Sequence, residues 1–356
     1  MKSYNVIGVM SGTSLDGLDI CYASFNHNND WNFTIKNSKT IELNPSLKSK
    51  LKNATTLSGL ELSLLHNQVG NFIGEAIMQF ITGFQINKNE IDFISSHGHT
   101  IFHQPEKQLT LQIGNGANIS ALTKLPVVCD FRTTDLALKG NGAPLVPIGD
   151  KLLFSEFDNC INLGGISNIS YQKGNKRIAF DICPVNIVLN YLANQLGFDY
   201  DKNGELAIAG ILNKNLLNQL NNLDYYQNSP PKSLGYEWVE KNIFPLLKNS
   251  NLNQKDILRT FVEHIAFQIG NHLKQNEKTL FTGGGTHNKY LMERIQHFSN
   301  TQIIIPNQKI IDFKEALIFG FLGILRWRNE INTLSSVTGA GIDSIGGCVY
   351  DSFSIS

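Results

Sequence analysis

Residues 6–20 read VIGVMSGTSLDGLDI, an apolar run that ends in Ser-Gly-Thr-Ser and resumes after Leu-Asp-Gly. Two apolar runs separated by Gly, Ser and Asp are typical of two strands joined by a turn. The turn has two interpretations. It is an ordinary hairpin, because Gly, Asp and Ser favour turns, or its successive backbone N–H groups form a concavity that holds a phosphate.

The strand–turn–strand pattern occurs again in the second half of the chain. Residues 160–172 read CINLGGISNISYQ, and residues 279–295, TLFTGGGTHNKYLMERI, read as strand, Gly turn and helix. Internal duplication is a signal at the level of the fold, and strands mixed with helices are typical of α/β domains. We therefore expect an α/β protein of two similar domains, residues 1–155 and 156–356, with a central ligand cleft.

The remaining elements follow from hydrophobic periodicity. A helix is expected at 57–84, with apolar residues such as Leu60, Leu64 and Val69 at helical spacing. Strands are expected at 6–10, 20–25 and 31–35 as an antiparallel meander, then at 92–95, 109–113, 127–130, 177–181 and 303–305. Other helices are expected at 118–123, 186–196, 204–212, 257–274 and 314–328. Residues 222–233 read as a surface loop, in which Pro230-Pro231 excludes helix.

The composition is that of an ordinary globular protein, with 42% hydrophobic and 17% charged residues among 356. The 30 basic and 30 acidic residues balance, so no overall charge favours nucleic acid or a membrane surface. The 5 cysteines are scattered without a CxxC pair, which argues against a disulfide framework or a zinc site. No signal peptide or membrane-spanning run is found, so we expect a cytoplasmic protein.

The three Gly-rich turns belong to neither common phosphate motif. None contains the P-loop pattern G-x-x-x-x-G-K-[ST], and none has the G-x-G-x-x-G and following acid of a Rossmann site. Two hairpins can instead hold a polyphosphate from both sides, and three glycines before a helix let an adenine or ribose approach the backbone. Together they predict nucleotide-binding residues: Gly12, Thr13, Ser14, Leu15, Asp16, Gly17, Leu18, Asp19, Gly164, Gly165, Asn168, Gly283, Gly284 and Gly285.

Ten stretches follow one another between Val9 and Ala340: VMSGTSLDGLDI, SSHGHTIFHQP, TLQIGN, VVCDFRTTDLALKGNGAPLVP, NLGGISNIS, NGELAIAG, PPKSLGYEW, FTGGGTHN, KEALIFGFL and LSSVTGA. In this order they resemble the anhydro-N-acetylmuramic acid kinases, a family of the sugar kinase, actin and Hsp70-type ATPase superfamily. The resemblance implies a duplicated ribonuclease H-like fold of the actin/sugar kinase type. It also implies ATP and Mg²⁺ as cofactors and a homodimer.

The resemblance implies a reaction as well. The family converts 1,6-anhydro-N-acetylmuramic acid, ATP and water to N-acetylmuramic acid 6-phosphate and ADP, in the recycling of cell-wall sugars. Water attacks the anomeric carbon, and the liberated O6 attacks the γ-phosphate. Such an enzyme needs a general base for the water, and it needs positioning and charge neutralisation for phosphoryl transfer.

Asp181 ends a strand just before a helix, where aspartate is also a favoured N-cap. The resemblance makes it the catalytic base. The family continues from this aspartate with Gly-Pro-Gly-Asn, whereas this chain has Cys183-Pro184-Val185-Asn186. Asn186 keeps its predicted contact with substrate, but a branched Val185 forbids backbone geometries open to glycine. A nucleophilic role for Cys183 is disfavoured, because no partnered histidine is found and the reaction needs no thiol.

Glu315 and Arg132 complete the implied machinery. Glu315 is a favourable acid in the first turn of a helix, or, from the resemblance, a second catalytic residue. Arg132 is a structural partner of Asp130 or Asp135, or a substrate-binding residue whose guanidinium holds a carboxylate or phosphate. The arginines that often follow it in the family are threonines here.

The remaining polar candidates are two aspartates and three histidines. Asp16 or Asp19 either holds Mg²⁺ or only shapes the turn. His97, His99 and His103 alternate along a strand without a fourth ligand close in sequence, so zinc is disfavoured. We expect His97 to bind the sugar, with packing under the cleft as the alternative. Metal ligands therefore remain unassigned.

Two other functions compete with this one. The altered turn at Cys183–Asn186 is compatible with a kinase of the same fold that accepts a different amino sugar. A regulator that binds ATP without catalysis is the other alternative, and the presence of both Asp181 and Glu315 argues against it.

Overall fold

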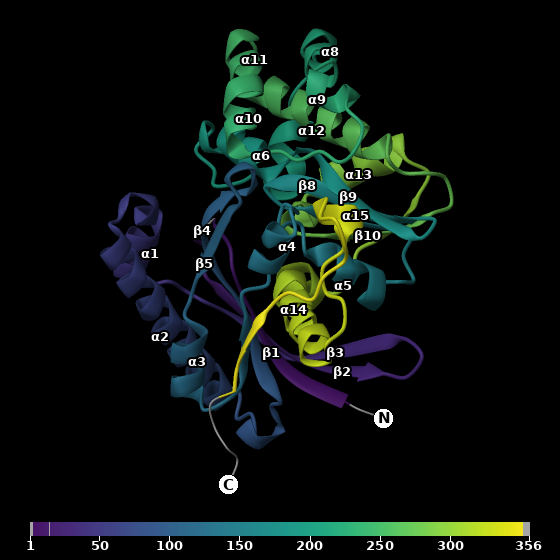
Figure 1. The fold of residues 1–356 in the computed structure, drawn as a ribbon. Coiled ribbons are helices and arrows are strands. Elements are labelled where there is room, and N and C mark those ends of the chain that lie inside the picture. The colour runs from purple at the N-terminus through teal and green to yellow at the C-terminus, as the bar shows by residue number, and fades with distance from the viewer. Residues whose placement is uncertain (1–2, 14, 352–356) are drawn as a thin grey trace. The chain divides into compact units, whose positions relative to one another are not determined.

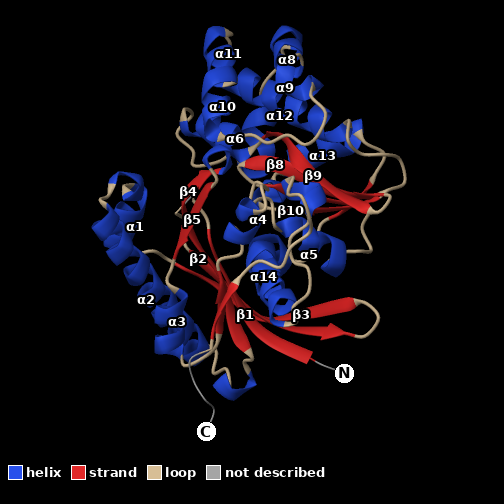
Figure 2. Cartoon of the chain, in the orientation of Figure 1, coloured by secondary structure: helices blue, strands red, loops and turns tan. Residues whose placement is uncertain are grey.

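The computed structural model of the chain describes residues 3–13 and 15–351 (Figures 1 and 2). Contacts divide it into two compact units. The first contains the described residues of Met1–Leu153 and Phe313–Ser356, and the second contains Phe154–Asp312. Each unit is an α/β body built around its own sheet.

The first unit has a 7-stranded sheet with the order β12-β6-β4-β1-β2-β3, and β5 pairs with β4. Strands β1, β2 and β3 form an antiparallel meander, whereas β4 and β6 run parallel to β1. The strands are β1 (Ser3–Ser11), β2 (Leu18–His27), β3 (Trp31–Ile41), β4 (Phe93–Gln104), β5 (Leu109–Ile113), β6 (Val127–Cys129) and β12 (Cys348–Tyr350).

The second unit repeats this connectivity in a 5-stranded sheet of order β11-β10-β7-β8-β9. Its strands are β7 (Asn159–Leu163), β8 (Ile166–Lys173), β9 (Lys176–Pro184), β10 (Lys278–Thr282) and β11 (Gln302–Ile304). Again three antiparallel strands come first. Strand β10 then pairs parallel with β7, and β11 pairs parallel with β10. The predicted duplicated ribonuclease H-like α/β fold is confirmed, while the central cleft stays a prediction.

Helices connect and cover these strands. In the first half they are α1 (Pro45–Lys52), α2 (Gly59–Gly83), α3 (Gly116–Thr123), α4 (Thr133–Ala137) and α5 (Val146–Leu153). In the second half they are α6 (Asn186–Asn194), α7 (Glu205–Ile208), α8 (Lys214–Asn221), α9 (Asp224–Gln227), α10 (Tyr236–Asn242), α11 (Phe244–Asn249), α12 (Gln254–Gly270), α13 (Lys289–Phe298), α14 (Gln308–Trp327) and α15 (Ser335–Thr338). Short 3₁₀ turns are η1 (Ala54–Thr56), η2 (Lys88–Glu90), η3 (Pro105–Lys107), η4 (Lys202–Gly204) and η5 (Gly284–His287).

Helix α2 is the predicted long helix, and it begins with a capping box. The Ser58 hydroxyl accepts from the Glu61 N–H, and the Glu61 carboxylate accepts from the Ser58 N–H, which satisfies two donors at the helix start. The apolar face agrees with the expected one only in part, since Val69 is buried but two leucines are not. Leu60 and Leu64 are 72% and 59% exposed, because the buried residues of α2 begin only at Leu65.

The C-terminal segment groups with the first unit, which differs from the expected division at residues 155 and 156. Helix α14 packs on β1, where a Cβ on Gly8 would collide with the main chain of Ala316 and Gly320. Strand β12 pairs with β6 and extends the first sheet. Both contacts join residues far apart in sequence, so local patterns did not indicate them.

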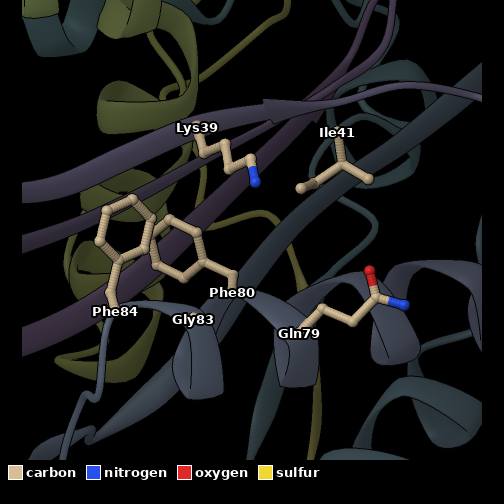
Figure 3. A pocket seen from close by; sticks show the side chains of 6 residues that line it. All are labelled: Lys39, Ile41, Gln79, Phe80, Gly83 and Phe84. Atoms are coloured by element: carbon tan, nitrogen blue, oxygen red, sulfur yellow. The ribbon is translucent and has the colours of Figure 1, made fainter.

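A pocket of about 270 Å³ lies in the first unit between β3 and the end of α2 (Figure 3). Lys39, Ile41, Gln79, Phe80, Gly83 and Phe84 line it, and none of them is a predicted site residue. Within the described ranges, no helix combines the length and hydropathy needed to cross a membrane.

Candidate functional site

The turn between β1 and β2 carries the first group of predicted nucleotide-binding residues. It contains Gly12, Thr13, Leu15, Asp16 and Gly17, with Leu18 and Asp19 at the start of β2, while Ser14 lies outside the described residues. The Leu15 N–H donates to the Gly12 carbonyl at 3.2 Å, and Leu15 has a φ of 58°. A left-handed φ is uncommon at a leucine, so the chain turns sharply here.

Strand β3 supports the same turn from one side. A Cβ on Gly17 would lie 2.5 Å from Thr40 Cγ2 and 3.0 Å from the Ile41 carbonyl oxygen, so glycine is required by the close approach. The Thr40 hydroxyl donates to Asp19 Oδ1 at 2.6 Å. The Asp19 carboxylate is therefore oriented at the base of the turn.

His97 and Arg132 form a buried hydrogen-bonded pair in the first unit. Arg132 Nε donates to His97 Nε2 at 3.0 Å, and Arg132 Nη1 donates to the Gly142 carbonyl at 2.7 Å. His97 Nδ1 lies 3.0 Å from the Gly98 carbonyl, so the proton of the neutral ring belongs on Nδ1. Burial, together with Arg132, holds the pKa of His97 well below its usual value, which keeps the imidazole neutral beside the guanidinium.

The two aspartates that were alternative partners of Arg132 bind other groups. Asp130 accepts from a neighbouring threonine hydroxyl at 2.7 Å. Asp135 is buried and accepts from the Gly142 N–H and the Thr338 hydroxyl, each at 2.7 Å. Within the described chain neither aspartate pairs with Arg132, so the guanidinium is positioned by its two neutral acceptors.

Glu315 lies in α14 beside the buried ion pair between Lys314 Nζ and Asp150 Oδ1, which are 2.7 Å apart. Because α14 begins at Gln308, Glu315 is not in its first turn, and the helix-start interpretation is wrong. The Glu315 side chain is exposed to solvent. Even so, the surrounding protein raises the pKa of its carboxyl group. Arg132 and Lys314 oppose this rise, and the charge of Asp19 adds to it. Glu315 thus shares one electrostatic region with Arg132 and the end of the first turn.

The second unit gathers the other predicted nucleotide-binding glycines around Leu163. A Cβ on Gly283, which has a φ of 85°, would lie 2.8 Å from the Leu163 carbonyl carbon, and one on Gly285 would lie 2.7 Å from Leu163 Cβ. A Cβ on Gly284 would meet its nearest neighbour only at 3.9 Å. The glycine run therefore packs tightly against the end of β7 and leaves its middle residue open.

Asn186 ties the hairpin Gly164–Gly165 to the start of α6. Its side-chain amide donates to the Leu163 carbonyl at 3.0 Å, and its N–H donates to the Gly164 carbonyl at 3.2 Å. The Val185 N–H donates to the Gly165 carbonyl at 2.9 Å. The structure thus brings Asn186 and all five predicted glycines of this unit into one neighbourhood.

A row of polar residues crosses the second sheet next to this neighbourhood. Thr282 lies opposite Asn162, Asn162 opposite Asn168, and Asn168 opposite Asp181. Residues directly opposite each other share a face of the sheet. Ser167 pairs with Cys183, so β9 has an extra residue at this point, and such bulges re-aim side chains beside functional sites.

Asp181 is half-buried near the end of β9, and it does not cap α6, since the N-cap position belongs to Val185. The Leu234 N–H donates to Asp181 Oδ2 at 2.9 Å. Burial raises the pKa of Asp181, and this hydrogen bond opposes the rise. Among the described residues no donor reaches Oδ1, so one carboxylate oxygen is available to accept a proton.

The residues that replace the family's glycines fit their positions. Val185 has a φ of −127°, outside the left-handed region that favours glycine, and its side chain lies in the hydrophobic core of the second unit. The Cys183 thiol is also fully buried, and burial raises its pKa. The cysteine is therefore held as a neutral thiol, unlike an activated nucleophile.

The histidines of β4 do not form a metal centre. His99 Nδ1 lies 2.9 Å from the Ser11 hydroxyl, and His103 Nδ1 lies 3.2 Å from the Thr110 hydroxyl. Within residues 3–13 and 15–351, no group of three or more His, Cys, Asp or Glu side chains is arranged to hold a metal ion. Packing and hydrogen bonding account for these two rings.

Two features of the site were not predicted from the sequence. Asn162 joins the polar row through its place opposite Asn168, and its position just before the second glycine hairpin was the available signal. The contact of Leu234 with Asp181 joins residues 53 apart, and nothing in the local pattern indicated it.

The family model for anhydro-N-acetylmuramic acid kinase matches residues 4–352 of this chain. The chain is 34% identical over 373 residues to an anhydro-N-acetylmuramic acid kinase from Aliivibrio fischeri, covering 98% of this chain and 99% of the relative. It is also 34% identical over 370 residues to one from Sulfurimonas denitrificans, with 97% and 99% covered. A solved activator of 2-hydroxyisocaproyl-CoA dehydratase from Clostridium difficile is 12% identical, with a TM-score of 0.45 over 91% of this chain and 97% of that one.

Proposed function

Because the chain belongs to the anhydro-N-acetylmuramic acid kinase family, we propose that it opens the 1,6-anhydro ring of 1,6-anhydro-N-acetylmuramic acid and phosphorylates O6 at the expense of ATP. The products are N-acetylmuramic acid 6-phosphate and ADP, an activity of peptidoglycan recycling. The observation that carries the proposal is the Asp181 carboxylate, with one oxygen fixed by the Leu234 N–H and a pKa raised by burial.

In the proposed reaction Asp181 acts on water. Its free Oδ1 accepts a proton from the water as the water oxygen bonds to the anomeric carbon. The bond from that carbon to O6 breaks, and O6 leaves with the electron pair. O6 then attacks the γ-phosphorus and ADP departs, while the proton on Asp181 is released to solvent. A carboxylate whose pKa is raised toward neutrality is a better proton acceptor, and general-base catalysis contributes roughly 10²–10⁴-fold.

The first unit would bind the anionic groups. The Arg132 guanidinium is held at Nε and Nη1, which leaves its remaining N–H donors for a substrate carboxylate or phosphate. His97 would act on the sugar through Arg132, because its Nε2 is occupied by that guanidinium. Glu315, with a raised pKa, would orient the sugar or assist proton movement.

The glycine turns would bind ATP. Residues Gly12–Asp19 and the hairpin Gly164–Gly165 present backbone amides to phosphates, and the open Gly284 suits a flat adenine or ribose. Mg²⁺ in such sites keeps several waters and needs only one or two carboxylates. The oriented Asp19 carboxylate fits such a role, with Asp16 as a second candidate, and the ion would neutralise phosphate charge when bound.

We further propose that the protein works in the cytoplasm as a homodimer, and that its two compact units serve as its two ATPase domains. Sequence composition and the family support these assignments. The proposed location, dimer and domain roles do not depend on the catalytic roles proposed for individual residues.

The experiment that tests the function is product analysis with a matched pair of variants. The chain is incubated with Mg-ATP and the anhydro sugar, and sugar 6-phosphate is measured by mass spectrometry. Asp181→Asn should retain ATP binding and lose turnover. Asp199→Asn, the same change at an exposed aspartate of the second unit, should keep it. Equal turnover in the two variants, or phosphorylation only of other amino sugars, would overturn the proposal.

A further inference from the structure

The segment from Tyr225 to Leu234 contacts Asp181 at three different groups. The Tyr225 hydroxyl donates to the Asp181 carbonyl at 2.6 Å. The Asp181 N–H donates to the Lys232 carbonyl at 3.2 Å, and the Leu234 N–H donates to Asp181 Oδ2 at 2.9 Å. The main chain of Asp181 is thus held on both sides, and its carboxylate is held at one oxygen.

The same segment is itself anchored to the second unit. The Tyr225 ring is buried and lies 5.3 Å from the Trp238 ring. The Lys232 ammonium lies 4.7 Å above the Tyr225 ring and 5.6 Å from the Phe180 ring, and it donates to the Tyr225 carbonyl at 3.3 Å. These contacts join Lys232 to Tyr225 at the other end of the segment and to Phe180 of β9. They therefore fix the direction in which the backbone N–H groups of the segment point.

From this arrangement we infer that residues 225–234, hereafter the clamp segment, position Asp181 for proton transfer. The Leu234 N–H fixes Oδ2 and so selects the carboxylate orientation in which Oδ1 receives the proton. The inference rests on the proposed role of Asp181 as the base. Leu234 and Tyr225 are positioning residues, because they act through Asp181.

Three other ionisable groups, those of Tyr225, Cys183 and His272, lie on or against this part of β9. Burial raises the pKa of the Tyr225 hydroxyl and of the Cys183 thiol, and it lowers the pKa of His272, behind Phe180, to about 4. These three groups are neutral near pH 7. Lys232 then supplies the only charge of the clamp segment that faces this strand end, within the described residues.

The direct test observes the hydrogen bond in the intact chain. Protein labelled with ¹⁵N-leucine is titrated between pH 4 and 8 without substrate, and the amide signals are compared with those of Asp181→Asn. An amide bonded to a carboxylate shifts when that carboxylate ionises, so the Leu234 amide should titrate in the unsubstituted chain and not in the variant. A Leu234 amide insensitive to pH, or one that titrates equally in both proteins, overturns the inference.

A pair of variants tests the consequence for catalysis. Leu234→Pro removes the N–H donor, and Leu234→Ala keeps it while losing the side chain. A hydrogen bond to the charged form lowers the pKa of a carboxyl group, so its loss raises that pKa. The acid limb of the kcat/KM profile should therefore lie about one pH unit higher in the proline variant than in the alanine variant. Coincident acid limbs in two folded variants contradict the clamp.

The two experiments separate the clamp from the proposed function. If the Leu234 amide follows Asp181 but neither the proline variant nor Asp181→Asn alters turnover, the clamp stands and the role of Asp181 as base fails. If Asp181→Asn abolishes turnover but the Leu234 amide does not titrate, the base stands and the clamp fails.

Discussion

Replacing Arg132 by lysine keeps the positive charge of this residue and removes the geometry of its guanidinium. In the structure the guanidinium is fixed by two hydrogen bonds, from Nε to His97 and from Nη1 to Gly142. A lysine ammonium is a point charge at the end of a flexible chain and cannot satisfy both acceptors while also binding an anion.

The expected loss follows from the contacts that disappear. A hydrogen bond to a charged group contributes about 1.5–3 kcal/mol. If Arg132 makes one such bond to the substrate anion, Arg132→Lys should lower kcat/KM for the sugar by about 10- to 150-fold. Because the charge is retained, the KM for ATP should change much less than kcat/KM for the sugar.

Steady-state kinetics with each substrate varied at saturating levels of the other measure this effect. Arg328→Lys is the matched control, since Arg328 bonds Glu330 and Tyr4 at the start of β1. It should keep kcat/KM within about twofold. A kcat/KM for Arg132→Lys equal to that of the control would refute the assignment of Arg132 as the anion-binding residue.

Two further predictions concern the second unit. Burial lowers the pKa of His264 to about 3, so the unfolded chain binds a proton below pH 6.5 that the folded chain rejects, and stability falls as pH falls. Between pH 7 and 5 the free energy of unfolding falls by about 2 kcal/mol for this reason. His264→Gln should abolish this part of the fall, as measured by amide hydrogen exchange in α12. Equal pH slopes in both proteins would contradict it. Val185→Gly should destabilise the second unit by about 2–3 kcal/mol without raising turnover, since Val185 is fully buried at a negative φ. Higher activity in the glycine variant, measured beside its urea midpoint, would show that the valine restricts the loop.

The local features of the fold were accessible from the sequence. The meander, both glycine hairpins and the glycine run after β10 lie where the pattern indicated, because turn chemistry and alternation are short-range signals. Helix α2 was predicted and Val69 is buried as expected, but Leu60 and Leu64 fall in its exposed first turns. Periodicity identifies a helix more surely than it identifies which face is covered.

Long-range contacts could not be predicted in this way. The pairing of β12 with β6 and the packing of Ala316 against Gly8 place the C-terminal segment with the first unit, although it follows the second in sequence. Likewise Asp181 was found from a motif, but its hydrogen bond from Leu234 depends on the path of an irregular segment. Such a path is fixed by the tertiary contacts of Tyr225 and Lys232.

The most direct test of the central claim is the fate of the oxygen of water. The chain is incubated with Mg-ATP and 1,6-anhydro-N-acetylmuramic acid in ¹⁸O-water, quenched early, and the product is fragmented in a mass spectrometer. We predict a 6-phosphorylated sugar that carries one ¹⁸O at the anomeric carbon and none in the transferred phosphate. Label in the phosphate, or an anhydro sugar that stays intact while ATP is consumed, would contradict the coupling of ring opening to phosphorylation.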